Sequence, residues 1–560
     1  MEVPSLSGAR LVRISAAILA VALISAALRG QTTTYEQALE YYKSNVERPP
    51  LGIRAGAWHI LAGARDPRGL EQLVKDYARV DSPHEFARSA LVISVATGCG
   101  THAPPGFWKS WRTKNAKAEH CWLWFIGPYY EFESDKDVFW NIVGDSSLPV
   151  ELRAATLIGA GDQRGVGCWS ENMEARLLGF VQKPPPKGHE RTLLLEAWSN
   201  FFQAHDKPLE AEHKAALRRL IPLMTDSATS ERTRIVMSRH FAKALDREDV
   251  GPDPAIWEAL MEDVPTPDAE LAYARAKALA KPGFCGVVDH GKSIAFVVDA
   301  SDSMLEPLTP RERTDLVPLT GGNSGGKAEA AQQEGAIVEQ AIDWKKVQTR
   351  FDCARELLKL ALRRLQPNQS FTVILFGHDA EYLKTTVGMV AANKRNIDDA
   401  CKQLDEIAPG PATNDRPYGT LNGATNIHSG MLCAFRVAGA RTSSPRAPTS
   451  RDFSKLDEKG IHTIYLFSDG APTVDGFGAT DSNESGIVQD AETGRKFQKS
   501  GKAWYPGPFM MARNLAPECV RLNMFQHATI HAIGLGEADV SLLKKIAGEN
   551  GGKCILIGKD

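Results

Sequence analysis

Oxygen-bearing side chains follow a short apolar run near the middle of the chain. The run 294–298 ends in Asp299, and Ser301 and Ser303 follow at alternate positions. These side chains offer only oxygen donors, which hard cations such as Mg²⁺ prefer. Because Mg²⁺ keeps several of its waters, a few protein ligands suffice and one coordination position can stay open. The pattern predicts a divalent-cation site.

Two later segments offer further oxygen donors. A second apolar run, Thr463–Ser468, ends in Asp469 and Gly470, where glycine allows the chain to turn sharply. Between the two runs, Thr425 stands directly before a helical pattern. In a doubly wound sheet, ligands bind beyond the carboxyl ends of the strands, where the strand order reverses. We therefore expect the two acidic strand ends to meet at one edge of a sheet.

The order Asp299-x-Ser301-x-Ser303, then Thr425, then Asp469 resembles the metal-ion-dependent adhesion site of von Willebrand factor A (vWA) domains. The resemblance covers roughly residues 292–560 and includes the phrases 296–304, 423–427 and 466–472. It implies that Asp299, Ser301 and Ser303 form the first group of metal ligands. Thr425 would coordinate the metal directly or through water, and Asp469 would act directly or through a bridging water.

The resemblance also implies a function. A vWA domain would hold Mg²⁺, or another divalent cation such as Mn²⁺ or Ca²⁺, and its sixth coordination position would take an acidic side chain of a partner protein. Asp302 stands where the family often has glycine, which leaves the motif intact but could tune the local charge. No base, nucleophile and orienting group occur at mutual spacing, so we expect a binding module and not an enzyme.

A competing motif lies just before the first apolar run. The segment Gly286–Ser293 satisfies the phosphate-loop pattern GxxxxGKS, with Lys292 as its lysine. Such a loop must follow a strand and open a helix, whereas Ser293 here opens a strand. Three alternatives remain beside the binding module: a nucleotide hydrolase acting through Lys292, a metal-assisted hydrolase, and a helical scaffold whose metal site is vestigial.

The segment 292–560 alternates between strand-like and helical patterns. The expected strands are Ser293–Asp299, Ser370–Phe376, Thr463–Ser468, Thr529–Leu535 and Lys553–Ile557. The expected helices are Trp344–Leu365, Ala391–Ile407, Asn426–Ala438, Pro508–Phe525 and Asp539–Ala547. This alternation predicts a doubly wound, mostly parallel, Rossmann-like sheet with helices on both faces.

The segment 34–281 has a different character. Short amphipathic stretches rich in Ala, Leu and Arg are separated by Asp, Pro and Gly, which predicts helices throughout. The recurrence of phrases such as Arg88-Ser89-Ala90 and Arg153-Ala154-Ala155 resembles a degenerate HEAT-like repeat, although the spacing is irregular. The alternative is an irregular helical domain. The aromatic residues between Trp108 and Trp140 are expected in the core. The fold class is therefore α + α/β, with a helical-repeat-like region before the vWA-like domain.

The first 30 residues have the outline of an export signal. Arg10 and Arg13 precede an uncharged run, 14–28, that is short for a membrane-spanning helix. We expect a cleaved signal peptide or an uncleaved N-terminal anchor, and hence a periplasmic, extracellular or membrane-anchored protein. The alternative is a buried helix of a cytoplasmic protein.

Charge and cysteine content exclude other classes. The net charge of the 560 residues is −2, so no overall basic field favours nucleic acid as a partner. The nine cysteines form no CxxC pair, which argues against a zinc ribbon or a thioredoxin-like motif. If the compartment is oxidising, Cys285 and Cys554 could close the C-terminal domain with a disulfide.

Four long insertions interrupt the sheet pattern, at 304–343, 409–422, 441–460 and 471–505. All but 441–460 should emerge at the metal end of the sheet. Loops on the ligand face of a rigid scaffold commonly set specificity, so we expect these three to select the partner. Alternatively, they are tolerated surface insertions, because a longer loop costs little free energy.

Overall fold

The computed structural model describes residues 33–48, 50–80, 85–100, 103–131, 136–162, 173–185, 188–203, 209, 211–279, 284–319, 342, 347–414, 419–421, 423–437, 460–477, 487–489, 496–498 and 506–558. The expected export signal, 1–30, and most of the insertions 304–343 and 441–460 lie outside these residues. The chain forms two compact units, Met1–Asn115 with Gly476–Phe509 and Ala116–Asp475 with Met510–Asp560. The expected domain division between 281 and 292 stays a prediction.

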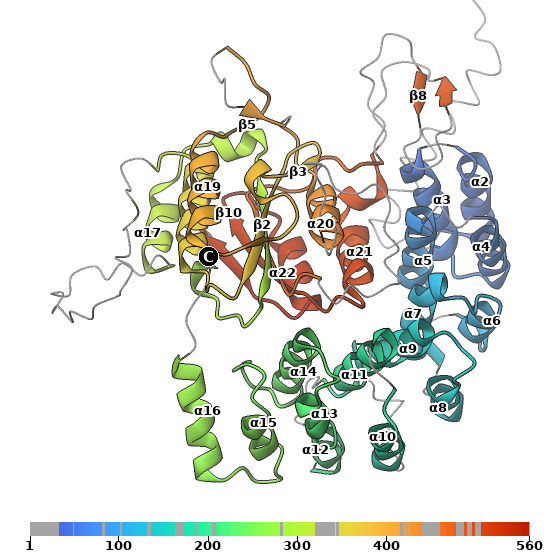
Figure 1. Ribbon diagram of the computed structural model, residues 1–560. Helices are drawn as coiled ribbons and strands as arrows, with labels where there is room; N and C mark the ends of the chain where they lie inside the picture. Colours follow the sequence, from blue (N-terminus) through green and yellow to red (C-terminus); the bar gives the residue numbers. More distant parts are fainter. Residues whose placement is uncertain are drawn as a thin grey trace, which may run out of the picture. The chain divides into compact units, whose positions relative to one another are not determined.

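The first unit is built from helices (Figure 1). They are α2 (Tyr35–Asn45), α3 (Leu51–Gly63), α4 (Pro67–Arg79), α5 (Glu85–Cys99) and α6 (Phe107–Thr113). Helix α4 begins as its sequence requires, with Asp66 as N-cap and Pro67 in the first turn. The carboxylate of Asp76 is buried in this unit and accepts hydrogen bonds from Tyr42 Oη at 2.7 Å and Trp58 Nε1 at 3.1 Å.

The segment 476–509 contributes aromatic side chains to the core of the same unit. Phe509 is fully buried, and its ring lies 6.0 Å from that of Phe86 in α5 and 5.6 Å from that of Phe477. A Cβ atom placed on Gly52 of α3 would overlap the carbonyl group of Pro506, so only glycine allows this close approach. The segment also carries the strand pair β8 (Ile487–Gln489) and β9 (Lys496–Gln498).

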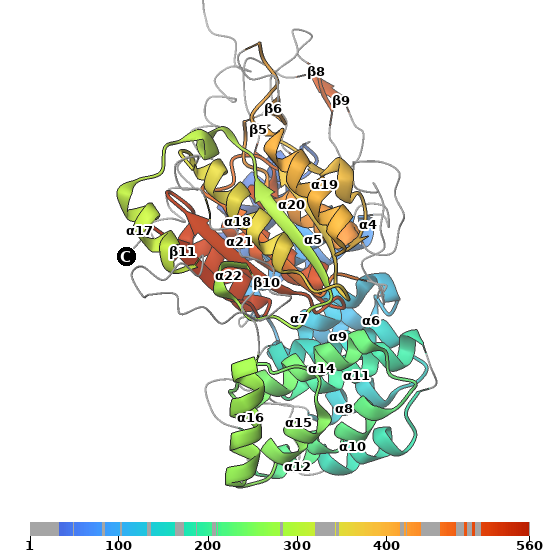
Figure 2. The same ribbon diagram turned by 60° about the vertical axis from the view of Figure 1, so that its left-hand side comes forward.

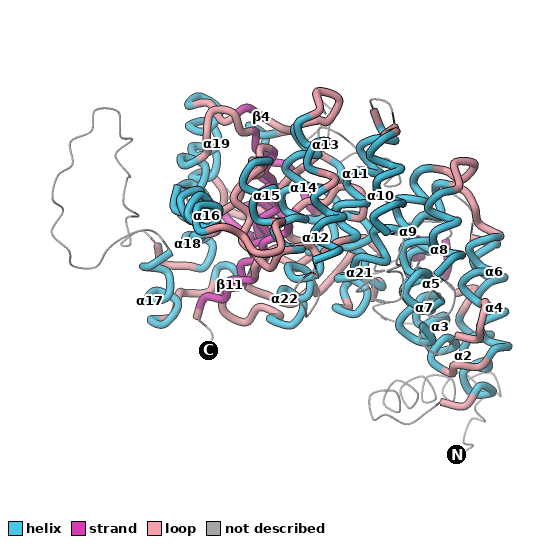
Figure 3. Tube along the Cα trace, turned by 90° about the horizontal axis from the view of Figure 1, so that it is seen from below, coloured by secondary structure: helices cyan, strands magenta, loops and turns pink. Residues whose placement is uncertain are grey.

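The second unit opens with a stack of helices. They are α7 (Cys121–Glu131), α8 (Lys136–Gly144), α9 (Val150–Asp162), α10 (Met173–Gln182), α11 (His189–Phe201), α12 (Ala211–Arg218), α13 (Ile221–Thr225), α14 (Glu231–Ala244), α15 (Pro254–Leu260) and α16 (Pro267–Leu279). Helix α9 packs between α7 and α11, and α11 packs against α14. Figure 3 shows the stack running from α9 through α11 and α14 to α16. The helical region is thus confirmed, whereas its HEAT-like repeat stays a prediction.

A mostly parallel sheet follows the helices. Its strands run in the order β11 (Cys554–Ile557), β10 (Thr529–Leu535), β7 (Thr463–Ser468), β1 (Ser293–Asp299), β2 (Ser370–Phe376) and β3 (Ala380–Tyr382). All neighbours are parallel except β3 and the short β4 (Val390–Ala391), which pair with β2 in antiparallel fashion. The predicted fold class is confirmed.

Helices cover both faces of this sheet (Figures 1 and 2). Phe296, Phe371 and Phe467 belong to a core that includes α17 (Pro310–Leu319), α18 (Arg350–Arg364) and α19 (Lys394–Asp405). The opposite face contacts α20 (Ile427–Arg436) and α22 (Val540–Glu549), with α21 (Ala512–Asn523) packed between these two helices. The strands are buried almost throughout, as expected for a sheet covered on both sides.

The predicted elements differ from the observed ones mainly at their ends. The fifth strand begins at Cys554 rather than Lys553, because the Lys553 N–H donates to His531 Nδ1 instead of joining the ladder. Helix α18 begins at Arg350, where Thr349 forms a capping box with Asp352. The antiparallel strands β3 and β4 were not predicted.

Three other expectations concern the described residues. Trp108, Trp111, Trp122, Trp124 and Trp140 are all buried, which confirms their place in the core. Cys285 and Cys554 are free thiols, which contradicts the disulfide hypothesis. Within the ranges given above, no helix combines the length and the apolar character needed to cross a membrane.

Candidate metal centre

The two acidic strand ends lie next to each other because β1 and β7 are neighbours in the sheet. Val298 pairs with Phe467, which aligns the ends of both strands. The chain continues from β1 to β2 on one side and returns to β7 on the other, so the strand order reverses between β1 and β7. Asp299 and Asp469 therefore stand at the topological switch point, as the sequence pattern predicts.

Hydrogen bonds connect the first group of predicted ligands. The Ser301 N–H donates to Asp299 Oδ1 at 2.9 Å, and the Ser303 hydroxyl donates to Asp469 Oδ1 at 2.7 Å. The hydroxyl oxygens of Ser301 and Ser303 are 3.0 Å apart. Ser468, the last residue of β7, donates its hydroxyl to Asp299 Oδ2 at 2.7 Å. The side chains of both strand ends thus form one polar network.

Thr425 lies beside this network, in the turn before α20. Its N–H donates to Thr473 Oγ1 at 2.8 Å, and its carbonyl accepts from the Thr473 N–H at 2.9 Å. A Cβ atom placed on Gly470 would lie 3.6 Å from Thr425 Oγ1 and 3.7 Å from Ser303 Oγ. Both hydroxyls therefore face the Gly470 backbone, and the structure brings all five predicted site residues together.

Arg350 is a member of the site that sequence reasoning missed. It is the first residue of α18, and its Nη1 lies 3.1 Å from Asp469 Oδ2 and 2.7 Å from Glu306 Oε2. Its Nε lies 3.3 Å from Glu312 Oε1. The guanidinium group therefore holds one oxygen of Asp469 while Ser303 holds the other. No local spacing links an arginine at a helix start to an aspartate so far along the chain.

Both carboxylates sit in an environment that opposes their charge. Burial, together with the nearby charge of Asp469, raises the pKa of Asp299 to about 7. Burial also raises the pKa of Asp469, although its hydrogen bonds from Ser303 and Arg350 act in the opposite direction. Two buried carboxylates that face each other are better accommodated when a cation shares the site.

The donor set fits a hard cation held mainly by hydroxyl groups. Two carboxylates and three hydroxyls converge, all from oxygen-bearing side chains. No group of three or more His, Cys, Asp or Glu side chains with metal-holding geometry occurs among the residues that the structure describes. Asp302 is exposed beside this set, and its carboxylate packs against Gly423.

The competing phosphate-loop motif lies at the amino ends of the parallel strands, whereas the candidate metal centre lies at their carboxyl ends. Lys292 directly precedes β1, and its ammonium group forms an ion pair with Glu231 of α14. Ser293 is the first residue of a strand and not of a helix. The segment Gly286–Ser293 therefore lacks the helix N-terminus on which phosphate binding by this motif depends.

Comparisons with known proteins give weak similarities only. Neither family models nor curated proteins match the chain. Among solved structures, a von Willebrand factor type A protein from Catenulispora acidiphila is 15% identical, with a TM-score of 0.25, covering 49% of this chain and 40% of that one. The PilB minor pilin from Streptococcus sanguinis is 16% identical, with a TM-score of 0.23, covering 47% and 56%. The chain thus spans less than two thirds of either protein.

Proposed function

We propose that the α/β domain is a metal-dependent protein-binding module of the vWA type. Asp299, Ser301, Ser303, Thr425 and Asp469 would hold Mg²⁺, or a similar divalent cation, at the carboxyl edge of the sheet. The metal would accept an acidic side chain of a partner protein in its open position. The observation that carries this proposal is the convergence of these five side chains, from three separate segments, at the switch point between β1 and β7.

The charges at the site support a cation rather than an anion as its direct ligand. Asp299 and Asp469 are fully buried, and Arg350 contacts only the second of them. A divalent cation would compensate the charge on Asp299, for which the described residues supply no ion pair. The hydroxyls of Ser301 and Ser303 can turn their lone pairs toward it, because a hydroxyl both donates and accepts.

Calorimetric titration of the full chain with Mg²⁺ and Mn²⁺ tests the metal site. We expect saturable binding, and Asp299→Ala should weaken it by at least roughly a hundredfold, since even the loss of an outer-shell group costs about tenfold to a hundredfold. Asp299→Asn removes the charge at constant volume and serves as a second variant. Asp398→Ala, which removes an exposed carboxylate from α19, is the matched control and should leave the affinity unchanged.

The binding of a partner requires a separate experiment. Capture of proteins from the native source, with and without EDTA, should yield a partner whose binding depends on both Mg²⁺ and Asp299. Unchanged Mg²⁺ affinity in the folded Asp299→Ala variant would contradict the metal site. Capture that survives both EDTA and this substitution would instead favour the helical region as a scaffold.

The proposal assigns binding and no catalysis to this domain. A nucleotide hydrolase acting through Lys292 is the runner-up, but Lys292 is engaged by Glu231 and precedes a strand. Measurement of ATP binding to the full chain distinguishes the two functions. ATP turnover that Lys292→Ala abolishes would support the hydrolase against the binding module.

We also propose that the protein is exported, on the basis of the charged and apolar pattern within residues 1–30. N-terminal sequencing of the protein from its native source tests this proposal. A new N-terminus near Ala27 or Gly30 would show cleavage, whereas an intact N-terminus in the membrane fraction would indicate an anchor.

A further inference from the structure

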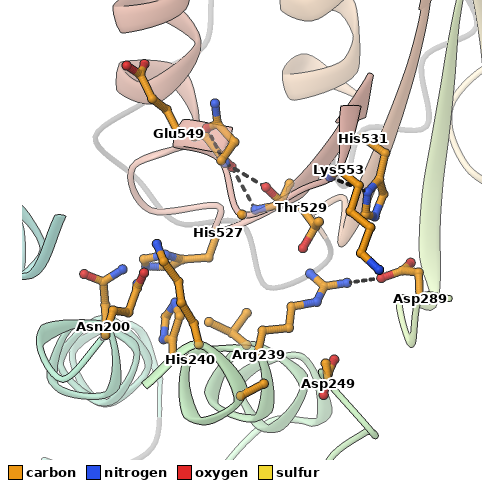
Figure 4. Close-up of a pocket in the computed structure, with 18 of the residues that line it drawn as sticks. Asn200, Arg239, His240, Asp249, Asp289, His527, Thr529, His531, Glu549 and Lys553 are labelled. Carbon is orange, nitrogen blue, oxygen red and sulfur yellow. Dashed lines mark hydrogen bonds and ion pairs between the residues drawn. The ribbon is translucent and has the colours of Figure 1, made fainter. Parts of the chain in front are cut away.

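A cleft of about 580 Å³ lies at the amino ends of the parallel strands, opposite to the candidate metal centre (Figure 4). Asn200 of α11 and Arg239 of α14 line one side, and the C-terminal end of α22 and the start of β10 line the other. Both walls belong to the same compact unit. The volume lies in the range of clefts that bind small molecules.

Four acidic side chains of the cleft wall already have partners. Asp289 accepts a hydrogen bond from Arg239 Nη2 at 2.8 Å, and this pair is visible in Figure 4. The other three pairs are Asp249 with Ser238, Glu248 with Lys277, and Glu549 with Lys545. The fifth acid, Asp246, is exposed, and its carboxylate forms no hydrogen bond or ion pair with a described residue. Arg239, Lys277 and Lys545 thus offset the charge of three of these acids, whereas Asp249 and Asp246 keep theirs.

Two side chains on the β10 side, His531 and Lys553, offer hydrogen-bond donors to the cleft. His531 Nδ1 accepts the Lys553 N–H at 3.0 Å, so the ring proton must reside on Nε2. His531 is 4% exposed, and its Nε2 has no hydrogen-bond partner in the described part of the chain. A buried donor of this kind calls for an acceptor. The ammonium group of Lys553, on the same wall in Figure 4, forms no ion pair with any described residue.

The opposite wall offers acceptors. The Gln203 side chain follows α11 and is 5% exposed, and its Oε1 has no hydrogen-bond partner among the described residues. The Ser199 hydroxyl donates to the Glu196 carbonyl at 3.0 Å, so it must accept from His240 Nδ1, 2.8 Å away. The second ring nitrogen of His240, which lines the cleft, is then an acceptor. A ligand with hydroxyl groups would satisfy this side.

We propose that this cleft binds a small organic anion that also carries hydroxyl groups. The Lys553 ammonium group and the Nε2–H of His531 bind its phosphate or carboxylate, and Gln203 and His240 accept from its hydroxyls. Charge-assisted hydrogen bonds to an anion are about twice as strong as neutral ones, so the anionic group dominates the affinity. This site is independent of the metal centre because it lies at the other edge of the sheet.

Calorimetric titration of the full chain tests the proposal, with inorganic phosphate and citrate as the probes. EDTA and constant ionic strength keep the metal centre out of the measurement. We expect saturable binding of at least one probe, and the stronger one shows whether the site prefers phosphate or carboxylate. Lys553→Met should weaken binding by about tenfold or more, as for loss of a hydrogen bond to a charged group.

Two further variants make the test decisive. Lys544→Met removes an exposed ammonium group from α22 outside the cleft, so it should bind the probe as the unmodified chain does. His531→Asn keeps an acceptor for the Lys553 N–H but lacks the Nε2 donor, so it should also lose affinity. The absence of saturable binding for both probes overturns the proposal. If Lys553→Met and Lys544→Met bind the probe with equal affinity, the proposal is overturned as well. The same holds if binding of the probe requires Asp299.

Discussion

At the scale of single residues, the Arg350 guanidinium group forms ion pairs with several carboxylates at the candidate metal centre. Its side chain is only 6% exposed, and it contacts Asp469 and Glu312, which are both almost completely buried. These carboxylates have lost their hydration and rely on the guanidinium charge in its place. A divalent cation near Asp469 would supply a second positive charge. If the proposed metal binds, we therefore expect Arg350 to link the stability of the domain to occupancy of the site.

We predict that Arg350→Gln lowers the free energy of unfolding in EDTA by about 3 kcal/mol, because it leaves buried carboxylates without a counter-charge. Saturating Mg²⁺ should recover part of this loss by binding beside Asp469 in the folded state. Urea denaturation with and without Mg²⁺ measures both effects. Arg395→Gln, which changes an exposed arginine of α19, is the control. If Arg350→Gln lowers the free energy of unfolding equally with and without Mg²⁺, Arg350 does not influence the metal centre.

At the scale of elements, helix α14 forms hydrogen bonds that connect the helical stack to the sheet within the second unit. Arg239 Nη1 donates to the His462 carbonyl at 2.7 Å, and the Arg232 guanidinium donates to the Gln526 carbonyl. The two arginines are seven residues apart and so lie on the same face of the helix. The His527 side chain is 8% exposed at this contact, and its Nε2 lies 4.0 Å from Glu196 Oε2. The contact thus contains neutral histidines beside fixed positive charges.

This contact should weaken in acid. Burial and the charge of Arg232 lower the pKa of His527 to about 3, against about 6.5 in an unfolded chain. The unfolded chain takes up the proton first as the pH falls. The stability that neutral His527 provides is therefore complete above about pH 6.5 and is lost progressively toward pH 3.

We predict that His527→Asn reduces the slope of unfolding free energy against pH by about 1.4 kcal/mol per unit between roughly pH 6 and 4. Asparagine tolerates the positive φ of 44° at this position. Urea midpoints across this range measure the slope. An unchanged slope in His527→Asn would show that another group controls it.

At the scale of the whole molecule, the chain leaves the second unit after β7 and returns to it before α21. The segment between them, 476–509, forms part of the unit of N-terminal helices. Phe477 and Phe509 pack there against Phe86 of α5. An insertion of the predicted vWA-like domain thus completes the core of the N-terminal helices. Whether the insertions also select a partner stays a prediction.

We predict that Phe509→Ala destabilises the first unit by about 3–5 kcal/mol, as expected when a buried aromatic ring is removed. Amide hydrogen exchange of the full chain should increase in α3 and α5 but not in β1. Met511→Ala, which truncates a side chain that is 39% exposed, provides the comparison. Equal protection of α5 in both variants would show that the segment does not stabilise these helices.

The main strands could be predicted because each is a short apolar run with a clear end. Four of the five have the predicted bounds, since strands buried on both faces are apolar throughout. Strands β3 and β4 escaped prediction because each is at most three residues long and lies at or near the edge of the sheet.

The sequence by itself determined which residue types could bind a cation and where each strand ends. Asp299 and Asp469 were identifiable because strand ends and oxygen donors are local features. Only the tertiary structure decided the complete strand order, the contact of Arg350 with Asp469, and the cleft that His531 and Lys553 line together. Strand order and ion pairs depend on contacts between distant segments, which local periodicity does not encode.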